Sequence, residues 1–216
     1  EFLNLCKTSE SFKESYPFVA NIPVNSAQAR DYALEGYLFP DTYEIYSDES
    51  AESIIGRMLT RFGQIMGDEY TARAAELNMS VDDVITLASL IEKEARHEND
   101  FTRVSAVFHL RLDKGMKLQS DAPLKYIFHT SGVLTFTAEQ MADTSLYNTH
   151  VYEGLPLGPI ANPGRKAIEA ALYPDEEYMN EGYLYFCLMD SETGELIYAK
   201  TLEEHNANVA KYRPNW

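Results

Sequence analysis

The sequence predicts an α+β fold with a helical centre, small antiparallel β elements and a C-terminal hairpin followed by a helix. Two observations support this prediction. Apolar residues at helical spacing, together with helix-capping signals, occupy the middle of the chain, whereas strand-like runs lie toward its ends. Helices and strands do not alternate regularly, which argues against a parallel sheet built from βαβ units.

The first long helix is expected from about Ser50 to Met66. Gly67 supplies a stop, and a shorter helix then reaches Leu77, with Asn78 closing it. The residues that form the apolar face of the long helix are Ile54, Ile55, Met58, Leu59, Phe62 and Ile65.

Two further helices are expected in the centre of the chain. Ser80, with Asp83 three positions later, forms a capping signature that opens a helix over residues 81–97. Asp100 is expected to cap the next helix, which covers residues 101–113. Shorter helices are expected at residues 137–141 and 165–172.

The C-terminal segment is expected to form a β-hairpin and a final helix. Apolar and aromatic runs at residues 182–189 and 195–199 predict two strands, and residues 191–194 supply the turn between them. Thr201 and Glu204 then form a capping box that starts the final helix.

The first thirty residues are interpreted as a lead-in to the main domain. Pro17 and Pro23 interrupt the helical spacing there. The chain starts at Glu1 without the basic and apolar segments of a signal peptide, and we interpret it as a fragment. A length of 216 residues allows one large domain with a small appendage. We therefore expect a lead-in at residues 1–30 and the main domain at residues 31–216.

Charge and motif content argue against several classes of function. A formal net charge of −16 would repel the phosphate backbone, so no nucleic-acid partner is predicted. No apolar run approaches the roughly 20 residues that span a bilayer. The motifs GxGxxG, GxxxxGK[ST], GxSxG and HExxH are absent, so no nucleotide, nucleophilic serine or metal site is predicted. Cys6 and Cys187 do not decide the redox compartment.

Two glutamates near the end of the helix expected at residues 81–97 are candidates for acid–base chemistry. At about 100° per residue, Glu92 and Glu94 fall on opposite shoulders of the apolar stripe, each roughly 80° from its centre. Partial burial there would raise a carboxyl pKa, which is what a general acid requires. The alternative is that both form solvated ion pairs on the helix edge. Helical spacing by itself does not choose between the two glutamates.

Three polar or aromatic segments have the composition of a ligand-binding loop. Residues 118–123 place an amide, a hydroxyl and a carboxylate in a turn that proline makes rigid. Residues 154–164 contain three prolines and three glycines, which specify a long loop of fixed shape, either a cleft wall or a structural brace. The aromatic residues at 35–43 either stack on sugar faces or, as is more common, fill a core.

Taken together, these segments resemble the MltG/YceG-like family of endolytic murein transglycosylases. The resemblance extends roughly from Ala33 to the C-terminus, and seven motifs in order are too many for a chance match. They are EGYLFPDTY (35–43), ASLIEKE (88–94), GMKLQSD (115–121), YNT (147–149), GLPLGPI (154–160), NPG (162–164) and EHN (204–206).

The resemblance implies cleavage of the MurNAc–GlcNAc β-1,4 bond within peptidoglycan glycan strands. A single glutamate protonates the leaving oxygen and then acts as a base while the MurNAc 6-hydroxyl attacks its own C1, which leaves a 1,6-anhydro end. An ordinary glycosidase needs two carboxylates. Here the nucleophile belongs to the substrate, so one suffices, and no cofactor is implied.

The resemblance also assigns roles to individual residues. The acid/base of the family aligns with the second glutamate of its motif, Glu94. Where the family often has threonine, this chain has Pro123 or Leu124. The residues expected to hold the substrate are Glu92, Gln119, Asp121, Tyr147, Asn148, Glu35 and Asn162.

Members of this family are anchored by an N-terminal transmembrane helix and act at the extracytoplasmic face of the bacterial cell membrane. A LysM-like region precedes their catalytic domain, so residues 1–30 would be its end and the anchor is absent from this fragment. The expected partners are glycan strands and, at the membrane, peptidoglycan synthases. Two alternatives remain: a non-catalytic peptidoglycan-binding module that tethers synthesis proteins, and a hydrolytic muramidase that leaves reducing ends.

Overall fold

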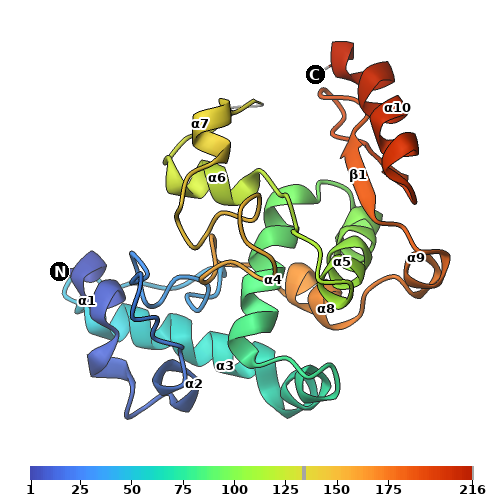
Figure 1. Ribbon diagram of the computed structural model, residues 1–216. Helices are drawn as coiled ribbons and strands as arrows, with labels where there is room; N and C mark the ends of the chain where they lie inside the picture. The colour runs from blue at the N-terminus through green and yellow to red at the C-terminus, as the bar shows by residue number, and fades with distance from the viewer. Residues whose placement is uncertain (133–134, 216) are drawn as a thin grey trace.

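The computed structural model describes residues 1–132 and 135–215, so Trp216, the last residue of the predicted main domain, lies outside it. Helices surround a central helix, and the described residues form one two-stranded antiparallel sheet, which confirms the predicted α+β class (Figure 1). In chain order the elements are α1 (Phe2–Thr8), η1 (Glu10–Phe12), α2 (Pro17–Ala20), α3 (Ala51–Glu76), α4 (Val81–Glu94), α5 (Glu98–Asp113), α6 (Ala122–Ile127), α7 (Ala138–Met141), α8 (Arg165–Leu172), α9 (Glu176–Glu181), β1 (Tyr185–Leu188), β2 (Leu196–Ala199), α10 (Leu202–Tyr212) and η2 (Arg213–Asn215).

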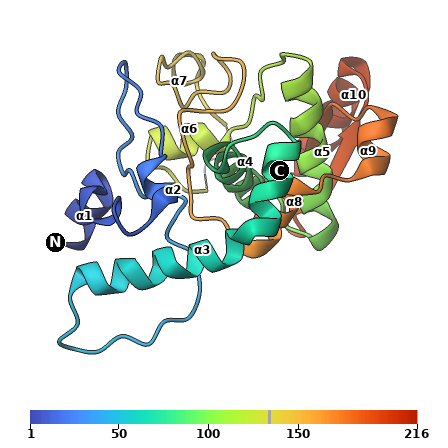
Figure 2. The same ribbon diagram turned by 90° about the horizontal axis from the view of Figure 1, so that it is seen from below.

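The long helix α3 contains the predicted break at Gly67. The backbone there has φ 41° and ψ −179°, which is not helical, so the two expected helices follow each other across a kink. Asn78, with φ 55°, lies just beyond the end of the second part, as predicted. Figure 2 shows α3 along the lower edge of the molecule, with the loop that precedes it beneath. The residues of α3 that are buried against the core are Ile55, Leu59, Phe62, Ile65, Met66 and Ala74.

Helix α4 is the centre of the core. It begins with the predicted capping box, in which the Ser80 hydroxyl accepts from the Asp83 amide at 3.1 Å and the Asp83 carboxylate accepts from the Ser80 amide at 2.9 Å. Every residue from Val84 to Ile91 is buried, because α3, α5, α6 and α8 pack around the helix. A helix enclosed on all sides provides a rigid support for side chains at its ends.

The end of α4 differs from the prediction. The helix was expected to continue to His97, but it ends at Glu94, where Ala95 adopts extended dihedral angles (φ −79°, ψ 137°). His97 is instead the N-cap of α5, and its amide donates to the Asp100 carboxylate at 3.3 Å. Asp100 is therefore the third residue of α5 and not its cap. This second capping box competes with helix continuation and starts α5 three residues earlier than expected.

Three short helices, α2, α6 and α9, are not predicted by the sequence pattern. Pro17 is the first residue of α2 and Pro123 the second residue of α6. A proline at the start of a helix sacrifices no intrahelical hydrogen bond, since the first N–H groups lack partners in any case. The same residues that were expected to interrupt or rigidify a loop therefore begin helices.

The N-terminal segment packs against the body of the molecule. Helix α1 contacts α3, and the Leu34 amide donates to the Cys6 carbonyl at 3.1 Å. The boundary expected at residue 30 stays a prediction. Within the part of the chain that the structure describes, no helix combines the length and apolar character needed to cross a membrane.

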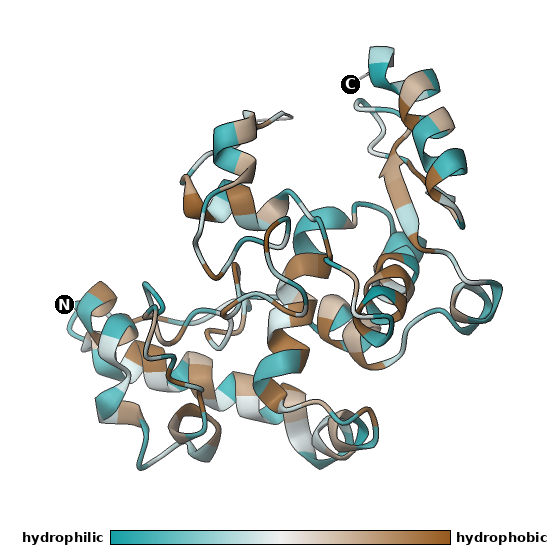
Figure 3. Ribbon diagram, viewed as in Figure 1, coloured by the Kyte–Doolittle hydropathy of each residue, from teal (hydrophilic) through white to brown (hydrophobic). Residues whose placement is uncertain are grey.

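The predicted hairpin and final helix are confirmed. Tyr185 pairs with Ala199 and Leu188 with Leu196 in antiparallel register, and α10 packs against both strands. Figure 3 shows hydrophobic residues on β1, with polar and apolar residues alternating along α10. Figure 1 shows the hairpin and α10 on one side of the C-terminal end of α4, with α6 and α7 on the other side.

Two of the sequence motifs are braced against each other beneath α4. The Asn162 side-chain oxygen accepts from the Gly36 amide at 2.8 Å and from the Leu38 amide at 3.2 Å. Gly36 has φ 90°, and a Cβ atom there would lie 2.5 Å from Pro159, so only glycine fits. Tyr37 is buried at 1% exposure, which places it in the core and away from any sugar.

Candidate active site

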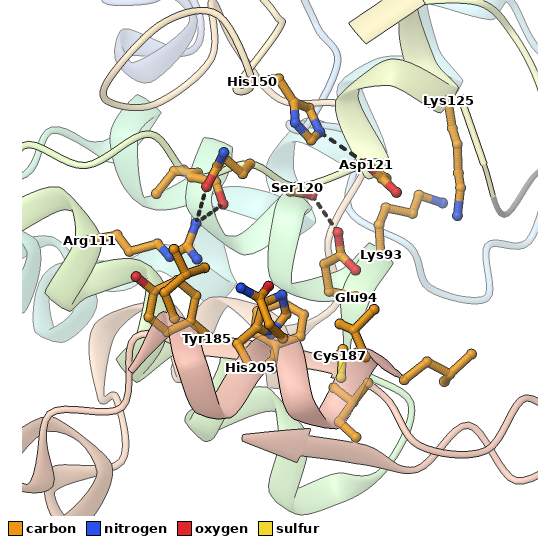
Figure 4. A pocket seen from close by; sticks show the side chains of 18 of the residues that line it. Lys93, Glu94, Arg111, Ser120, Asp121, Lys125, His150, Tyr185, Cys187 and His205 are labelled. Atoms are coloured by element: carbon orange, nitrogen blue, oxygen red, sulfur yellow. Dashed lines mark hydrogen bonds and ion pairs between the residues drawn. The ribbon is translucent and has the colours of Figure 1, made fainter. Parts of the chain in front are cut away.

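A cavity of about 490 Å³ opens above the C-terminal end of α4, between the loop that leads into α6 and the wall formed by β1 and α10. Figure 4 shows side chains from both sides converging on it. The lining residues that bear on its chemistry are Lys93, Glu94, Arg111, Gln119, Ser120, Asp121, Lys125, His150, Tyr185, Cys187, His205 and Asn206.

Glu94 occupies the middle of this cavity. It is the last residue of α4, and its carboxyl accepts a hydrogen bond from the Ser120 hydroxyl (Figure 4). Burial raises the pKa of the Glu94 carboxyl, and the charge of Asp121 acts in the same direction, while the Ser120 hydrogen bond and Lys125 oppose them. The protonated form of Glu94 therefore persists to higher pH than that of a glutamate in water, as a general acid requires.

Thr149 holds Ser120 in place. The Ser120 amide donates to the Thr149 hydroxyl at 3.1 Å, and that hydroxyl donates to the Ser120 carbonyl at 3.1 Å. The Gln119 amide also donates to the Thr149 carbonyl at 3.0 Å. The motifs at 115–121 and 147–149 thus meet, and their contact fixes the hydroxyl that bonds Glu94.

Gln119 and Asp121, predicted to hold the substrate, both line the cavity beside Glu94. The exposed Gln119 accepts a hydrogen bond from the Arg111 guanidinium at 3.4 Å through its side-chain oxygen. Asp121 is paired with the His150 ring at 2.9 Å. Their location fits the predicted role, while their contact with a sugar stays a prediction.

Tyr147 and Asn148 lie behind the cavity wall. Their exposures are 3% and 1%, and neither lines the cavity. The Asn148 side-chain amide donates to the carbonyls of Met141 and Asp143 at 3.1 and 2.8 Å, and the Tyr147 ring packs on Tyr126. Through these contacts Tyr147 and Asn148 hold the loop that carries Thr149 in shape. Direct contact with the substrate, as the sequence predicts, is not supported by this location.

The remaining predicted residues also lie outside the cavity lining. Glu92 accepts a hydrogen bond from the Gly164 amide at 3.1 Å, which attaches the 154–164 loop to α4. Asn162 braces the backbone of the 35–43 segment. Glu35 is half-buried, and burial raises the pKa of its carboxyl while Lys93 opposes that shift. Their predicted contacts with the sugar stay untested.

Sequence reasoning missed most of the wall opposite Glu94. The rings of Tyr185 and His205 stack with centroids 5.3 Å apart. The Arg111 guanidinium lies over the Tyr185 ring, 5.0 Å from its centroid. Arg111 is 7% exposed and also donates to the Leu118 carbonyl at 2.8 Å. The EHN motif contained a signal for His205, whereas Arg111 stands out in the sequence only as one of seven lysine and arginine residues from Lys93 to Lys125.

Cys187 also lines the cavity. Burial raises the pKa of its thiol to about 11, so the thiol is protonated at neutral pH and unsuited to nucleophilic attack. Within the described ranges, no cluster of three or more histidine, cysteine, aspartate or glutamate residues has the arrangement of a metal site. Glu94 is a lining carboxyl of this cavity whose pKa is raised by burial, as the predicted acid requires.

The fold and the cavity together define an α+β domain with a cavity at the end of its central helix, lined by a buried carboxyl of raised pKa. The model of the YceG-like family matches residues 3–211, and the chain belongs to this family.

Relatives of known name agree with this assignment. The chain is 39% identical over 184 residues to the endolytic murein transglycosylase of Bacillus subtilis (strain 168), covering 84% of this chain and 48% of that protein. It is 35% identical over 202 residues to the endolytic murein transglycosylase of Streptococcus pneumoniae (strain D39), covering 91% and 35% respectively. The chain thus spans less than half the length of these curated relatives.

A solved structure shares the fold. The crystal structure of a yceG-like protein from Listeria monocytogenes superposes with a TM-score of 0.80 at 34% sequence identity. The match covers 95% of this chain and 65% of the Listeria chain.

Proposed function

We propose that this chain is the catalytic part of an endolytic lytic transglycosylase that cleaves the MurNAc–GlcNAc β-1,4 bond of peptidoglycan strands. Family membership and the names of the relatives support the general activity. The observation that carries the assignment of the acid is the position of Glu94, whose carboxyl has a raised pKa and faces an open cavity.

In the proposed reaction Glu94 acts twice. The Ser120 hydroxyl bonds one carboxyl oxygen of Glu94, Oε1, and so orients the acid. Protonated Glu94 gives its proton to the glycosidic oxygen as the C1–O bond breaks. The carboxylate then accepts the proton of the MurNAc 6-hydroxyl as its oxygen bonds to C1, which forms the 1,6-anhydro ring and restores the acid. Gln119 and Asp121 hold the sugar.

Hydrolysis is the second candidate, and the position of Asp121 favours it. This carboxylate lines the same cavity as Glu94, and two carboxylates beside the scissile bond are what a hydrolytic glycosidase uses. Its pairing with His150 gives it a structural partner as well. Hydrolysis adds water to the bond and leaves a reducing end, so the products distinguish the two reactions.

The test is incubation of the purified protein with glycan strands, followed by mass spectrometry of the fragments. Fragments with 1,6-anhydro ends are expected from the wild type and from Glu92→Gln, and none from Glu94→Gln. Reducing ends would identify a muramidase. Loss of cleavage in Glu92→Gln with an active Glu94→Gln would overturn the assignment of the acid.

The non-catalytic alternative has its own outcome in the same assay. A folded wild-type protein that binds strands but releases no fragments would be a binding module. A longer form of the protein with residues added before Glu1 serves as the control, since the relatives are longer than this chain.

We further infer a location from the family resemblance. The whole protein would be anchored by an N-terminal transmembrane helix at the extracytoplasmic face of the cell membrane, with residues 1–30 as the end of a LysM-like region. Peptidoglycan synthases are the partners expected there. Fractionation of cells that express the whole protein, with crosslinking to recover neighbours, checks both points, and recovery in the soluble fraction would contradict the anchor.

A further inference from the structure

A second cavity of about 330 Å³ adjoins the first. Lys93 and Lys125 line both cavities and so mark the place where the two meet. Tyr126 and Thr130 belong to the walls of the second cavity alone. Figure 4 shows Lys93 and Lys125 on the side of Glu94 that faces Asp121. The space around the proposed acid is therefore branched.

The two lysines at the junction have no ion-pair partner among the described residues. Two carboxyl groups line the first cavity together with these lysines, and both interact with other groups: Glu94 with a serine hydroxyl, and Asp121 with a histidine. The charge of Lys93 opposes the rise in the pKa of Glu35, but the two groups form no ion pair. Two unpaired ammonium groups at one junction, in a chain of net charge −16, favour a bound anion.

The second cavity also contains an unsatisfied polar atom. The Thr130 hydroxyl is buried and has no hydrogen-bond partner within the residues that the structure describes. Buried hydroxyls in folded proteins nearly always have a partner, so a missing one points to a polar ligand. The cavity thus has two cations where it meets the first cavity and an unsatisfied hydroxyl on a residue of its wall.

We propose that this side cavity binds the carboxylate-bearing peptide branch of the substrate, with Lys93 and Lys125 pairing with its carboxylates. The inference rests on the proposed function. A glycan strand is linear, whereas the peptide leaves the muramic acid sideways through its lactyl group. A branched ligand with a charged branch matches a branched cavity with cations at the branch point, and the pairing would favour peptide-bearing strands over bare ones.

The experiment measures binding without cleavage, in the Glu94→Gln protein. Three ligands are titrated: the disaccharide with its stem peptide, the same disaccharide without the peptide, and the peptide-bearing disaccharide with its carboxyl groups amidated. The first is expected to bind tightest, with the other two weaker by roughly tenfold, since charge-assisted hydrogen bonds are lost. The amidated ligand separates the effect of charge from that of shape.

Variants then locate the effect. Lys93→Gln and Lys125→Gln, each in the Glu94→Gln background, should both reduce the preference for the first ligand, and the two combined should bind the three ligands within about twofold of one another, because both ammonium groups that discriminate are then gone. Lys114→Gln is the matched control: Lys114 is an exposed lysine outside both cavities, and its removal should preserve the full preference.

Wild-type kinetics provide the second readout. Lys93→Gln should raise KM for peptide-bearing strands by more than it changes KM for peptide-free strands, so that the preference between the two substrates decreases. If the Glu94→Gln protein binds the three ligands with equal affinity while the wild type cleaves strands, the side cavity does not bind the peptide branch, and the proposed function is left intact. A wild type that cleaves neither kind of strand would overturn the function, and this inference with it.

Discussion

The two ends of helix α4 each hold a carboxyl group, and the protein surrounds the two groups in opposite ways. At the start, Asp82 accepts two hydrogen bonds from the Arg30 guanidinium, at 2.8 and 2.5 Å, and a third from the Tyr37 hydroxyl at 2.6 Å. At the end, Glu94 accepts a hydrogen bond from the Ser120 hydroxyl and forms no ion pair with any of the described residues.

The difference separates an ion-paired carboxylate from the carboxyl that we propose as the acid. The buried charge of Asp82 is matched by a buried cation, and Arg30 also donates to the Leu157 carbonyl at 3.2 Å, so that three distant segments are tied together. Glu94 is desolvated without such a cation, which is why its proton is retained to higher pH. The first end of α4 stabilises the fold, and the second is available for chemistry.

Removing the acid should have the largest effect. Glu94→Gln keeps the shape of the side chain but cannot transfer a proton, so kcat should fall by about 10²–10⁴-fold, the typical contribution of general acid catalysis. Release of glycan fragments followed over time measures this. Activity within a few-fold of the wild type would show that another group is the acid.

The same variant tests the raised pKa through stability. Because the pKa of Glu94 is raised above its ordinary value of 4.5, the folded state binds the proton more tightly than the unfolded state. The associated stability is present below pH 4.5 and is lost as pH rises through the folded-state pKa. Glu94→Gln should therefore be more stable than the wild type at neutral pH, with the difference vanishing in acid, in urea unfolding at several pH values.

Breaking the pair at the other end should cost stability instead of chemistry. Asp82→Ala leaves Arg30 buried without its partner, for which about 3–5 kcal/mol is expected. Urea unfolding at pH 7 gives the difference, and kcat per folded molecule should stay close to the wild type. A loss of kcat without a loss of stability would reverse the roles assigned to the two ends.

The Ser120 hydroxyl offers a finer test of the reactive end. Its hydrogen bond lowers the pKa of Glu94, so Ser120→Ala should raise that pKa further. Cleavage needs the protonated acid, so kcat/KM falls as pH rises through this pKa, and the falling limb should move to higher pH in the variant. A decrease in rate of about tenfold should accompany the shift, as one positioning hydrogen bond is lost. If the falling limb of the pH profile stays at the wild-type position, the Ser120 hydroxyl does not lower the pKa of the catalytic acid.

Glu92 should show the smallest effect. Its hydrogen bond to the Gly164 amide braces a loop, so Glu92→Gln should lower the free energy of unfolding by about 1 kcal/mol. Cleavage should remain within a few-fold of the wild type. The matched pair of Glu92→Gln and Glu94→Gln, two residues apart on one helix, compares a bracing carboxyl with a reacting one.

The sequence by itself determined those parts of the local structure that strong local signals specify. The capping boxes at Ser80 and Thr201 start α4 and α10 as predicted, and the apolar runs around residues 191–194 form the hairpin. The ordered motifs were also sufficient to identify the family, which the match over residues 3–211 confirms. Each of these features depends on residues close together in the chain.

Only the tertiary structure decided which groups meet. Helical spacing left Glu92 and Glu94 equivalent, and the end of α4 at Glu94, with Ser120 packed above it, separates them. The Arg30 partner of Asp82, and the hydrogen bond that Arg111 in the cavity wall donates to the Leu184 carbonyl, likewise join residues remote in sequence. Burial and partner choice set the proton affinity of a carboxyl, and both arise only when distant segments pack together.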